Sequence, residues 1–246
     1  MELKQFLKTV LGICLFPAAA AAVYTTGKNL ADVFSHFGVT FPLLTGAAVY
    51  AAAHIIKRYR CGNGLKNDDR LYVLAHELSH AAAAVFSGVR VRSISVKKNS
   101  GCVVTDSSNL FITLAPYFIP FYTAAVLAAY FVCRLCFDIP DLREWALGAA
   151  GFTLAFHITH TADTLSGPTQ IDLKKAGGVL FSIPLLTLMN CLFIAVTVKL
   201  LFPELLSIKH VSLSLLHDEK KVYTAVIYML KYTYSILLGA VTSLNR

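Results

Sequence analysis

Charged side chains are scarce in this sequence. They make up 15% of its 246 residues, whereas a soluble domain of this length usually contains about a quarter. The apolar residues, 56% of the chain, fall in long blocks. Six blocks approach the roughly 20 residues that cross a bilayer: 6–25, 38–56, 109–134, 145–163, 178–202 and 222–241. The sequence therefore predicts an all-α polytopic membrane protein, a bundle of about six transmembrane helices.

The sequence also lacks the patterns of several other protein classes. It has no basic patch interleaved with exposed aromatic residues, so its net charge of +8 does not indicate nucleic-acid binding. Its six cysteines are scattered and imply no disulfide framework. No internal repeat or Pro/Gly/Ser-rich linker separates domains. The basic residues crowd two loops, near 57–70 and 90–98, and such loops usually mark the cytoplasmic side of a membrane.

The first and last apolar blocks each have two interpretations. Residues 1–25 contain Lys4 and Lys8, an apolar centre and small residues, which also describes a signal peptide. We favour a first transmembrane helix because further apolar blocks follow. The last block is interrupted by Lys231, so it could either span the bilayer or lie in its interface.

The motif HELSH is an HExxH sequence inside an Ala-rich segment with helical periodicity, residues 71–88. Residues four apart share a face of a helix, so His76 and His80 can present their imidazoles to one metal ion. Glu77 would lie beside that ion, where it could take a proton from water. Ionisable groups at membrane depth are costly and usually functional. Because zinc suits two imidazoles and a carboxylate with one open position, we expect one Zn²⁺ per chain.

Residues 89–105 change from a helical to an alternating pattern. The stretch VRVRSISV is rich in β-branched residues, and CVVT follows at 102–105. This pattern predicts a small β-hairpin directly after the HExxH helix, which we expect to end at Gly88. Lipid would leave the backbone polar groups of a hairpin unsatisfied, so the hairpin must lie against the bundle, line a cavity or lie at the surface.

The third metal ligand must come from elsewhere in the chain. Ala83 and Phe86 stand where the longer HExxHxxGxxH pattern has Gly and His, so that zincin class is excluded. Glu144, in the loop PDLREW, would suit a gluzincin-like arrangement. Residues 156–178 are richer in candidate ligands. They contain His157, His160, Asp163 and Asp172.

A family resemblance rests on HELSH followed by FSGVRVRSISV, GCV and NLFITLAP. This succession resembles the core of the site-2 proteases, which are intramembrane zinc metallopeptidases. In that family a Gly-containing bend leads from the HExxH helix into a membrane-associated β-hairpin. A later transmembrane segment supplies an Asp as third ligand, usually in an LDG motif. The stretch GPTQIDL at 167–173, with Gly177 and Gly178 behind it, occupies the matching place.

When the functional residues of that family are matched to this sequence one by one, the resemblance implies that His76, His80 and Asp172 bind zinc. It also implies that Glu77 is the general base. Two departures affect the match at Asp172. Leu173 follows it in place of Gly, and the Asn–Pro–Asp order of the usual motif is not intact. The resemblance covers about residues 70–200, and the chain would be a compact member of the family without a PDZ domain.

His160 is the main rival for the third ligand position, with Asp163 behind it and His157 one helical turn away. These three residues could instead orient the ligands from outside, and His160 could stabilise an oxyanion. The stretch LAPYFIPFY is expected to kink a membrane helix and not to bind substrate. Its residues of note are Pro116, Tyr117 and Pro120.

The resemblance therefore implies a zinc-dependent intramembrane endopeptidase that hydrolyses peptide bonds in or near transmembrane segments of other proteins. We divide the chain into an N-terminal two-helix region with a basic loop (1–69), a catalytic membrane core (70–202), and a polar segment with a last apolar helix (203–246). The resemblance supports only the second of these regions. We expect a multi-pass protein of the bacterial inner membrane, whose partners are the lipid bilayer and a membrane-protein substrate, with no nucleic acid. Two alternatives stay open: a non-catalytic metal- or partner-binding pseudoprotease, and a membrane gluzincin that would require Glu144.

Overall fold

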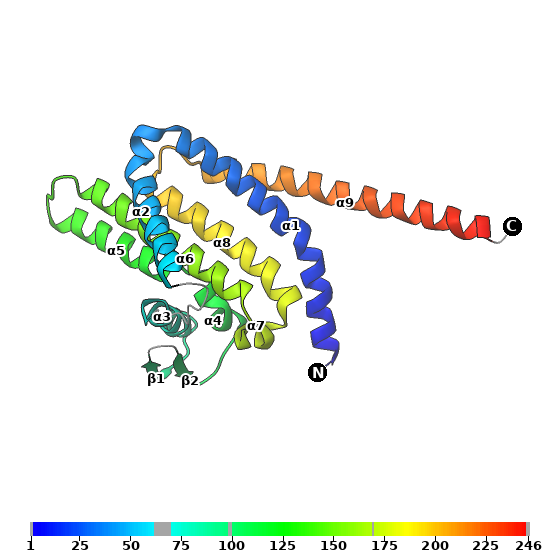
Figure 1. Cartoon of the computed structure of the whole chain (residues 1–246), viewed down its shortest axis with the longest axis horizontal. Coiled ribbons are helices and arrows are strands. Elements are labelled where there is room, and N and C mark those ends of the chain that lie inside the picture. Colours follow the sequence, from blue (N-terminus) through cyan, green and yellow to red (C-terminus); the bar gives the residue numbers. More distant parts are fainter. Residues whose placement is uncertain (1, 62–69, 98–99, 169, 245–246) are drawn as a thin grey trace. The chain divides into compact units, whose positions relative to one another are not determined.

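The computed structural model describes residues 2–61, 70–97, 100–168 and 170–244. Its elements, drawn in Figure 1, follow in this order: α1 (Glu2–Ser35), α2 (Phe37–Cys61), α3 (Arg70–Phe86), β1 (Val91–Val96), β2 (Gly101–Thr105), α4 (Leu110–Leu114), the 3₁₀ helix η1 (Ala115–Tyr117), α5 (Phe121–Cys136), α6 (Leu142–Ser166), α7 (Ile171–Ala176), α8 (Val179–Leu201) and α9 (Ile208–Leu244). The predicted fold class is confirmed, because helices dominate and one small hairpin follows the HExxH helix. The chain forms two compact units, one from residues 1–33 and 183–246 and the other from residues 34–182.

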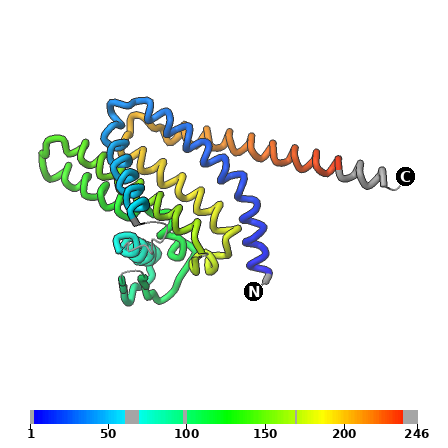
Figure 2. The backbone as a smooth tube through the Cα atoms, in the orientation of Figure 1, coloured from blue at the N-terminus to red at the C-terminus, as the bar shows by residue number. Residues whose placement is uncertain are grey.

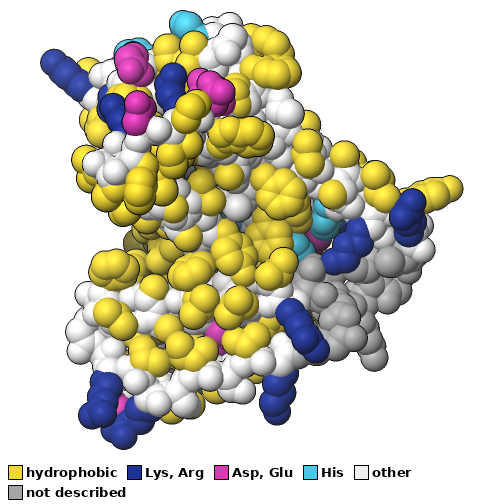
Figure 3. Space-filling view, turned by 90° about the vertical axis from the view of Figure 1, so that its left-hand side faces the viewer, with side chains coloured by type: hydrophobic (Ala, Val, Ile, Leu, Met, Phe, Trp, Pro, Cys, Tyr) yellow, Lys and Arg dark blue, Asp and Glu magenta, His cyan; other side chains and the backbone are white. Residues whose placement is uncertain are grey.

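Three helices in the described part of the chain are long and apolar enough to cross a membrane. They contain Leu3–Ser35, Phe37–Arg60 and Val179–Leu201. A fourth candidate is a broken span, in which Leu110–Tyr117 and Phe121–Cys136 meet at 85°. The sequence predicts six spans, but polar residues interrupt the apolar stretches of α6 and α9. Many large apolar side chains are exposed, as the hydrophobic surface in Figure 3 illustrates, and contact with lipid would cover them.

In the unit of residues 34–182, α2 and α6 pack closely because glycines remove side chains from their contact. A Cβ atom at Gly151 would overlap with the backbone of Leu43, and one at Gly46 would overlap with the backbone of Gly148. Small residues allow helix backbones to approach in this way in membranes. α5 lies beside α6 (Figure 1), so these three helices form a packed group next to α3.

α3 ends in a Schellman motif that turns the chain into the hairpin. Gly88 has a φ of 68°, a conformation that glycine adopts without steric cost. Its N–H donates to the carbonyl of Val85 at 3.0 Å, and the N–H of Val89 donates to that of Ala84 at 2.8 Å. The predicted end of the helix at Gly88 is therefore confirmed. β1 and β2 pair antiparallel, and Figure 2 shows the hairpin beside α3, which both strands contact.

The next segment is capped at its start and broken near its middle. Asn109 caps α4, since its Oδ1 accepts from the N–H of Ile112 at 2.8 Å, and its Nδ2 donates to Ser87 Oγ at 3.2 Å. This pair of bonds ties the start of α4 to the end of α3. The 85° bend between η1 and α5 falls at 118–120, which confirms the kink expected in LAPYFIPFY.

α1, α8 and α9 make up most of the other unit. Asp218 of α9 is buried, and its Oδ2 accepts a hydrogen bond from Thr25 Oγ1 at 2.8 Å and lies 3.7 Å from Lys28 Nζ. Farther along α9, the hydroxyl of Tyr223 donates to the carbonyl of Cys14 at 2.8 Å. These bonds join α9 to α1, and the residues of HELSH lie in the unit of residues 34–182.

Candidate metal centre

α3 presents the two histidines of HELSH on one face, as their spacing predicts. The ring centroids of His76 and His80 are 4.9 Å apart, with an interplanar angle of 80°. Ala81, Ala83 and Ala84 on the next turn are buried, so neighbouring elements approach the helix closely. Both imidazoles remain partly accessible, with side-chain exposures of 16% and 15%.

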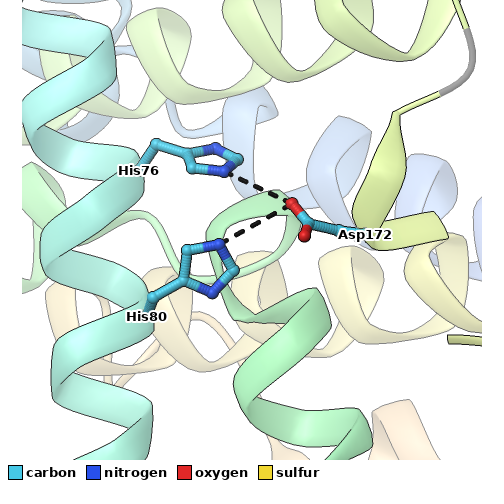
Figure 4. A group of neighbouring side chains, drawn as sticks. All are labelled: His76, His80 and Asp172. Atoms are coloured by element: carbon cyan, nitrogen blue, oxygen red, sulfur yellow. Dashed lines mark ion pairs between the residues drawn. The ribbon is translucent and has the colours of Figure 1, made fainter. Parts of the chain in front are cut away.

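α7 brings Asp172 to these histidines. Its Oδ2 lies 3.6 Å from His76 Nε2 and 3.7 Å from His80 Nε2, and Figure 4 shows the three side chains pointing toward one another. Burial alone would raise the pKa of Asp172, but hydrogen bonds and charge from the two histidines outweigh it and hold this pKa below its usual range. The carboxylate is the form of this group that binds metals.

The arrangement fits a tetrahedral zinc ion. Zinc binds imidazole nitrogen and carboxylate oxygen at about 2.0–2.2 Å, which places tetrahedral ligand atoms about 3.3–3.6 Å apart. The nitrogen–oxygen distance from His76 lies at the upper end of this range, and the one from His80 lies 0.1 Å above it. One ligand atom from each of His76, His80 and Asp172 lies within 4.8 Å of the others, and no other such group occurs among the described residues. Two imidazoles, a carboxylate and an open position are the donor set of catalytic zinc sites.

The backbone of α4 fixes the orientation of His80. The Nδ1 of His80 lies 2.7 Å from the carbonyl oxygen of Ile112. If Nδ1 carries the proton and donates it to this carbonyl, Nε2 keeps its lone pair for a metal. Ile112 lies in the turn that Asn109 caps, so the cap of α4 supports the orientation of His80.

Tyr117 of η1, which the sequence did not assign to the site, contacts both His76 and Asp172. Its hydroxyl donates to Asp172 Oδ2 at 3.1 Å, and its ring lies perpendicular to that of His76 with centroids 5.3 Å apart. The sequence placed Tyr117 in a kink without a role in binding, because nothing in the spacing of LAPYF connects it to residues 55 positions later. The predicted kink is confirmed. It also brings the Tyr117 side chain against His76 and Asp172, which together with His80 form the candidate metal centre.

Glu77 is buried on the hairpin side of the centre. It is 6% exposed, and a Cβ atom at Gly101, the first residue of β2, would overlap with its side chain. The absence of a side chain at Gly101 thus makes room for the Glu77 carboxyl group. Burial raises the pKa of Glu77 above its usual range, although the nearby His76 and His80 oppose the effect.

The rival ligands of α6 lie elsewhere in the same unit. His160 is buried and stacks on the ring of Tyr72, with centroids 5.1 Å apart and an interplanar angle of 18°. Asp163 lies 3.5 Å from His54 Nε2 and 3.4 Å from Arg58 Nη1. Neither side chain belongs to the group that could hold the ion.

The remaining candidates are also outside that group. His157 lines a small cavity beside His76, together with aromatic side chains of α3, α5 and α6. Glu144, which a gluzincin would require, is exposed in the first turn of α6. Of the ligands considered from the sequence, the structure brings together His76, His80 and Asp172.

Comparison with known proteins gives one family match. Residues 45–134 match the family described as Peptidase M50B-like, whereas no curated protein and no solved structure matches the chain. The matched segment includes HELSH, the hairpin and NLFITLAP, the residues on which the resemblance to the site-2 proteases rests. It covers less than half of the chain and ends before Asp172. The match supports the site-2 protease resemblance, and by it the central segment of this chain, residues 45–134, is Peptidase M50B-like.

Proposed function

We propose that the chain is a zinc-dependent intramembrane endopeptidase. The observation that carries this proposal is the approach of Asp172 to His76 and His80. Asp172 lies outside the matched segment, so the complete donor set supports the proposal independently of the family match. The peptidase family and the candidate membrane spans agree with a protease that acts within a membrane. Following the resemblance, we propose the bacterial inner membrane as its location.

We assign a chemical role to each residue of the candidate metal centre. His76, His80 and Asp172 would hold one zinc ion per chain. When bound, zinc would polarise the scissile carbonyl and lower the pKa of a water ligand. Glu77 would take a proton from the attacking water and pass it to the amine nitrogen of the leaving product.

The proposed substrate is a transmembrane segment of another protein. A helix hides its own peptide bonds, so the substrate must become extended before it reaches Glu77. The hairpin has two strands and therefore two unpaired edges, and its residue Gly101 lies against Glu77. A substrate strand added to one of these edges would be held extended next to the proton acceptor.

Replacement of the general base tests the catalytic role. In Glu77→Gln the amide cannot accept the proton, so cleavage of a single-span membrane-protein substrate in liposomes should fall by at least about 100-fold. Zinc content, measured by elemental analysis of the purified protein, should stay at one ion per chain. Cleavage at the wild-type rate in this variant would exclude the proposed mechanism.

Replacement of the third ligand tests the donor set. Asp172→Ala should lose zinc, whereas His160→Ala should keep it, because His160 lies outside the group of ligands. Zinc lost with His160 and kept without Asp172 would contradict the assignment. Zinc bound by the wild-type protein without any cleavage would favour the pseudoprotease.

A further inference from the structure

Tyr117 occupies an unusual place in the broken helix. It is the last residue of η1, directly after Pro116, and the chain bends by 85° before α5 begins. Its side chain is 1% exposed. A phenol buried to this degree normally has a polar partner for its hydroxyl group, and here the partner is Asp172.

Two of the contacts of Tyr117 join proposed ligands that come from different elements. The hydroxyl group donates to Asp172 Oδ2 at 3.1 Å, and this is the carboxylate oxygen that faces both histidines. The ring packs edge to face against His76 at 5.3 Å and 90°. One side chain therefore constrains a ligand on α3 and a ligand on α7.

His76 and Asp172 depend on the contacts with Tyr117 for their orientation more than His80 does. His80 has the carbonyl of Ile112 behind it, whereas the Nδ1 of His76 is buried and has no hydrogen-bond partner among the described residues. Asp172 lies in the first turn of α7, a helix of only six residues. A helix this short contributes little rigidity of its own, so the direction of the Asp172 carboxylate depends on its contacts.

We propose that Tyr117 is a positioning residue, which aligns Asp172 through its hydroxyl group and His76 through its ring and thereby sets the zinc affinity of the centre. This inference rests on the proposed zinc site but not on the proposed peptidase activity. Groups that orient metal ligands from outside typically change metal affinity about 10- to 100-fold when removed.

Two substitutions separate the two contacts. Tyr117→Phe keeps the ring and removes the hydroxyl group, so zinc affinity, measured by competition with a chelator, should fall about 10-fold or more. Tyr117→Leu removes both contacts and should bind zinc more weakly than Tyr117→Phe. Tyr122→Phe is the matched control, because Tyr122 donates to the carbonyl of Leu71 at 2.8 Å and its ring contacts among the described residues are with Phe121 and Phe156. Its affinity should equal that of the wild type.

Two further measurements distinguish positioning from a general effect on folding. The thermal unfolding of zinc-free Tyr117→Phe should match that of the zinc-free wild type, and the visible absorption bands of the Co²⁺-substituted variant should shift because the carboxylate ligand is reoriented. Wild-type zinc affinity in Tyr117→Phe would overturn the inference. Weaker binding accompanied by an equal loss in Tyr122→Phe would overturn it as well.

The same experiment separates this inference from the proposed function. If the wild type binds zinc and cleaves its substrate but Tyr117→Phe binds zinc equally well, only the positioning role is wrong. If the wild type binds zinc, Tyr117→Phe binds it more weakly and neither cleaves, only the peptidase activity is wrong. A wild-type protein that binds no zinc would overturn both.

Discussion

The contact between the hairpin and Glu77 leads to a prediction whose size follows from the structure. A Cβ atom at Gly101 would lie 2.5 Å from Oε1 and 2.6 Å from Cδ of Glu77, whereas ordinary contacts begin at 3.4 Å. In Gly101→Ala the carboxyl group must therefore move by about 1 Å, and a displacement of about 1 Å in an active site can cost 100-fold in rate. We expect kcat to fall about 100-fold, equivalent to about 2.7 kcal/mol of activation free energy.

The assay compares initial rates of substrate cleavage at saturating substrate with the zinc content of each preparation. Zinc should stay at the wild-type level in Gly101→Ala, because the substitution affects the base and not the ligands. Gly38→Ala is the control, since nothing lies within 4 Å of a Cβ atom at that position. It should cleave at the wild-type rate.

A double substitution tests whether the loss acts through Glu77. If it does, Glu77→Gln with Gly101→Ala should be no slower than Glu77→Gln alone, because effects on one functional unit are not additive. Gly101→Ala with wild-type kcat would refute the reasoning, since the hairpin would then have moved away from Glu77. Loss of zinc together with activity would refute it too, because the substitution would have disrupted the fold.

Two further predictions concern the elements that support the centre. Gly151→Ala should destabilise the protein by about 1–3 kcal/mol, measured by denaturant unfolding in detergent, because its Cβ atom would overlap with the backbone of Leu43. Gly148→Ala, whose Cβ atom would make an ordinary contact at 3.7 Å, should cost much less, and equal losses would contradict the packing argument. Asn109→Ala should cost about 1 kcal/mol as a lost helix cap and should weaken zinc binding measured by chelator competition, because it loosens the turn whose carbonyl orients His80. Unchanged zinc affinity would exclude this link.

The shared face of His76 and His80 on α3 could be predicted because their relation is local. Residues four apart in a helix share a face, so HELSH alone placed His76 beside His80, and β-branched alternation alone placed a hairpin after Gly88. For the third ligand, local patterns could only rank several candidates. Asp172 is 92 positions from His80, and its approach depends on how α7 docks, which no local pattern encodes.

The membrane spans show the limit of reading composition alone. Long apolar blocks correctly predicted a helical membrane protein, but the described helices include three candidate spans, or four with the broken pair, where the sequence predicted about six. An apolar block can form a buried or bent helix as well as a spanning one. The bend after Tyr117 shows this at the candidate metal centre. Proline in the sequence predicts that the helix breaks there, but it does not predict the direction in which the chain continues.

The sequence by itself thus determined the helical membrane class, the face of α3 that carries His76 and His80, and the presence of Glu77 between them. Those properties follow from helical periodicity and from the cost of placing ionisable groups among apolar ones. Only the tertiary structure decided that Asp172 completes the group, that Tyr117 contacts two of the ligands and that Gly101 makes room for Glu77. Each of these is a contact between different helices or strands. Such contacts depend on how the elements pack in three dimensions, and they produce no regular spacing of residues that could be recognised in the sequence.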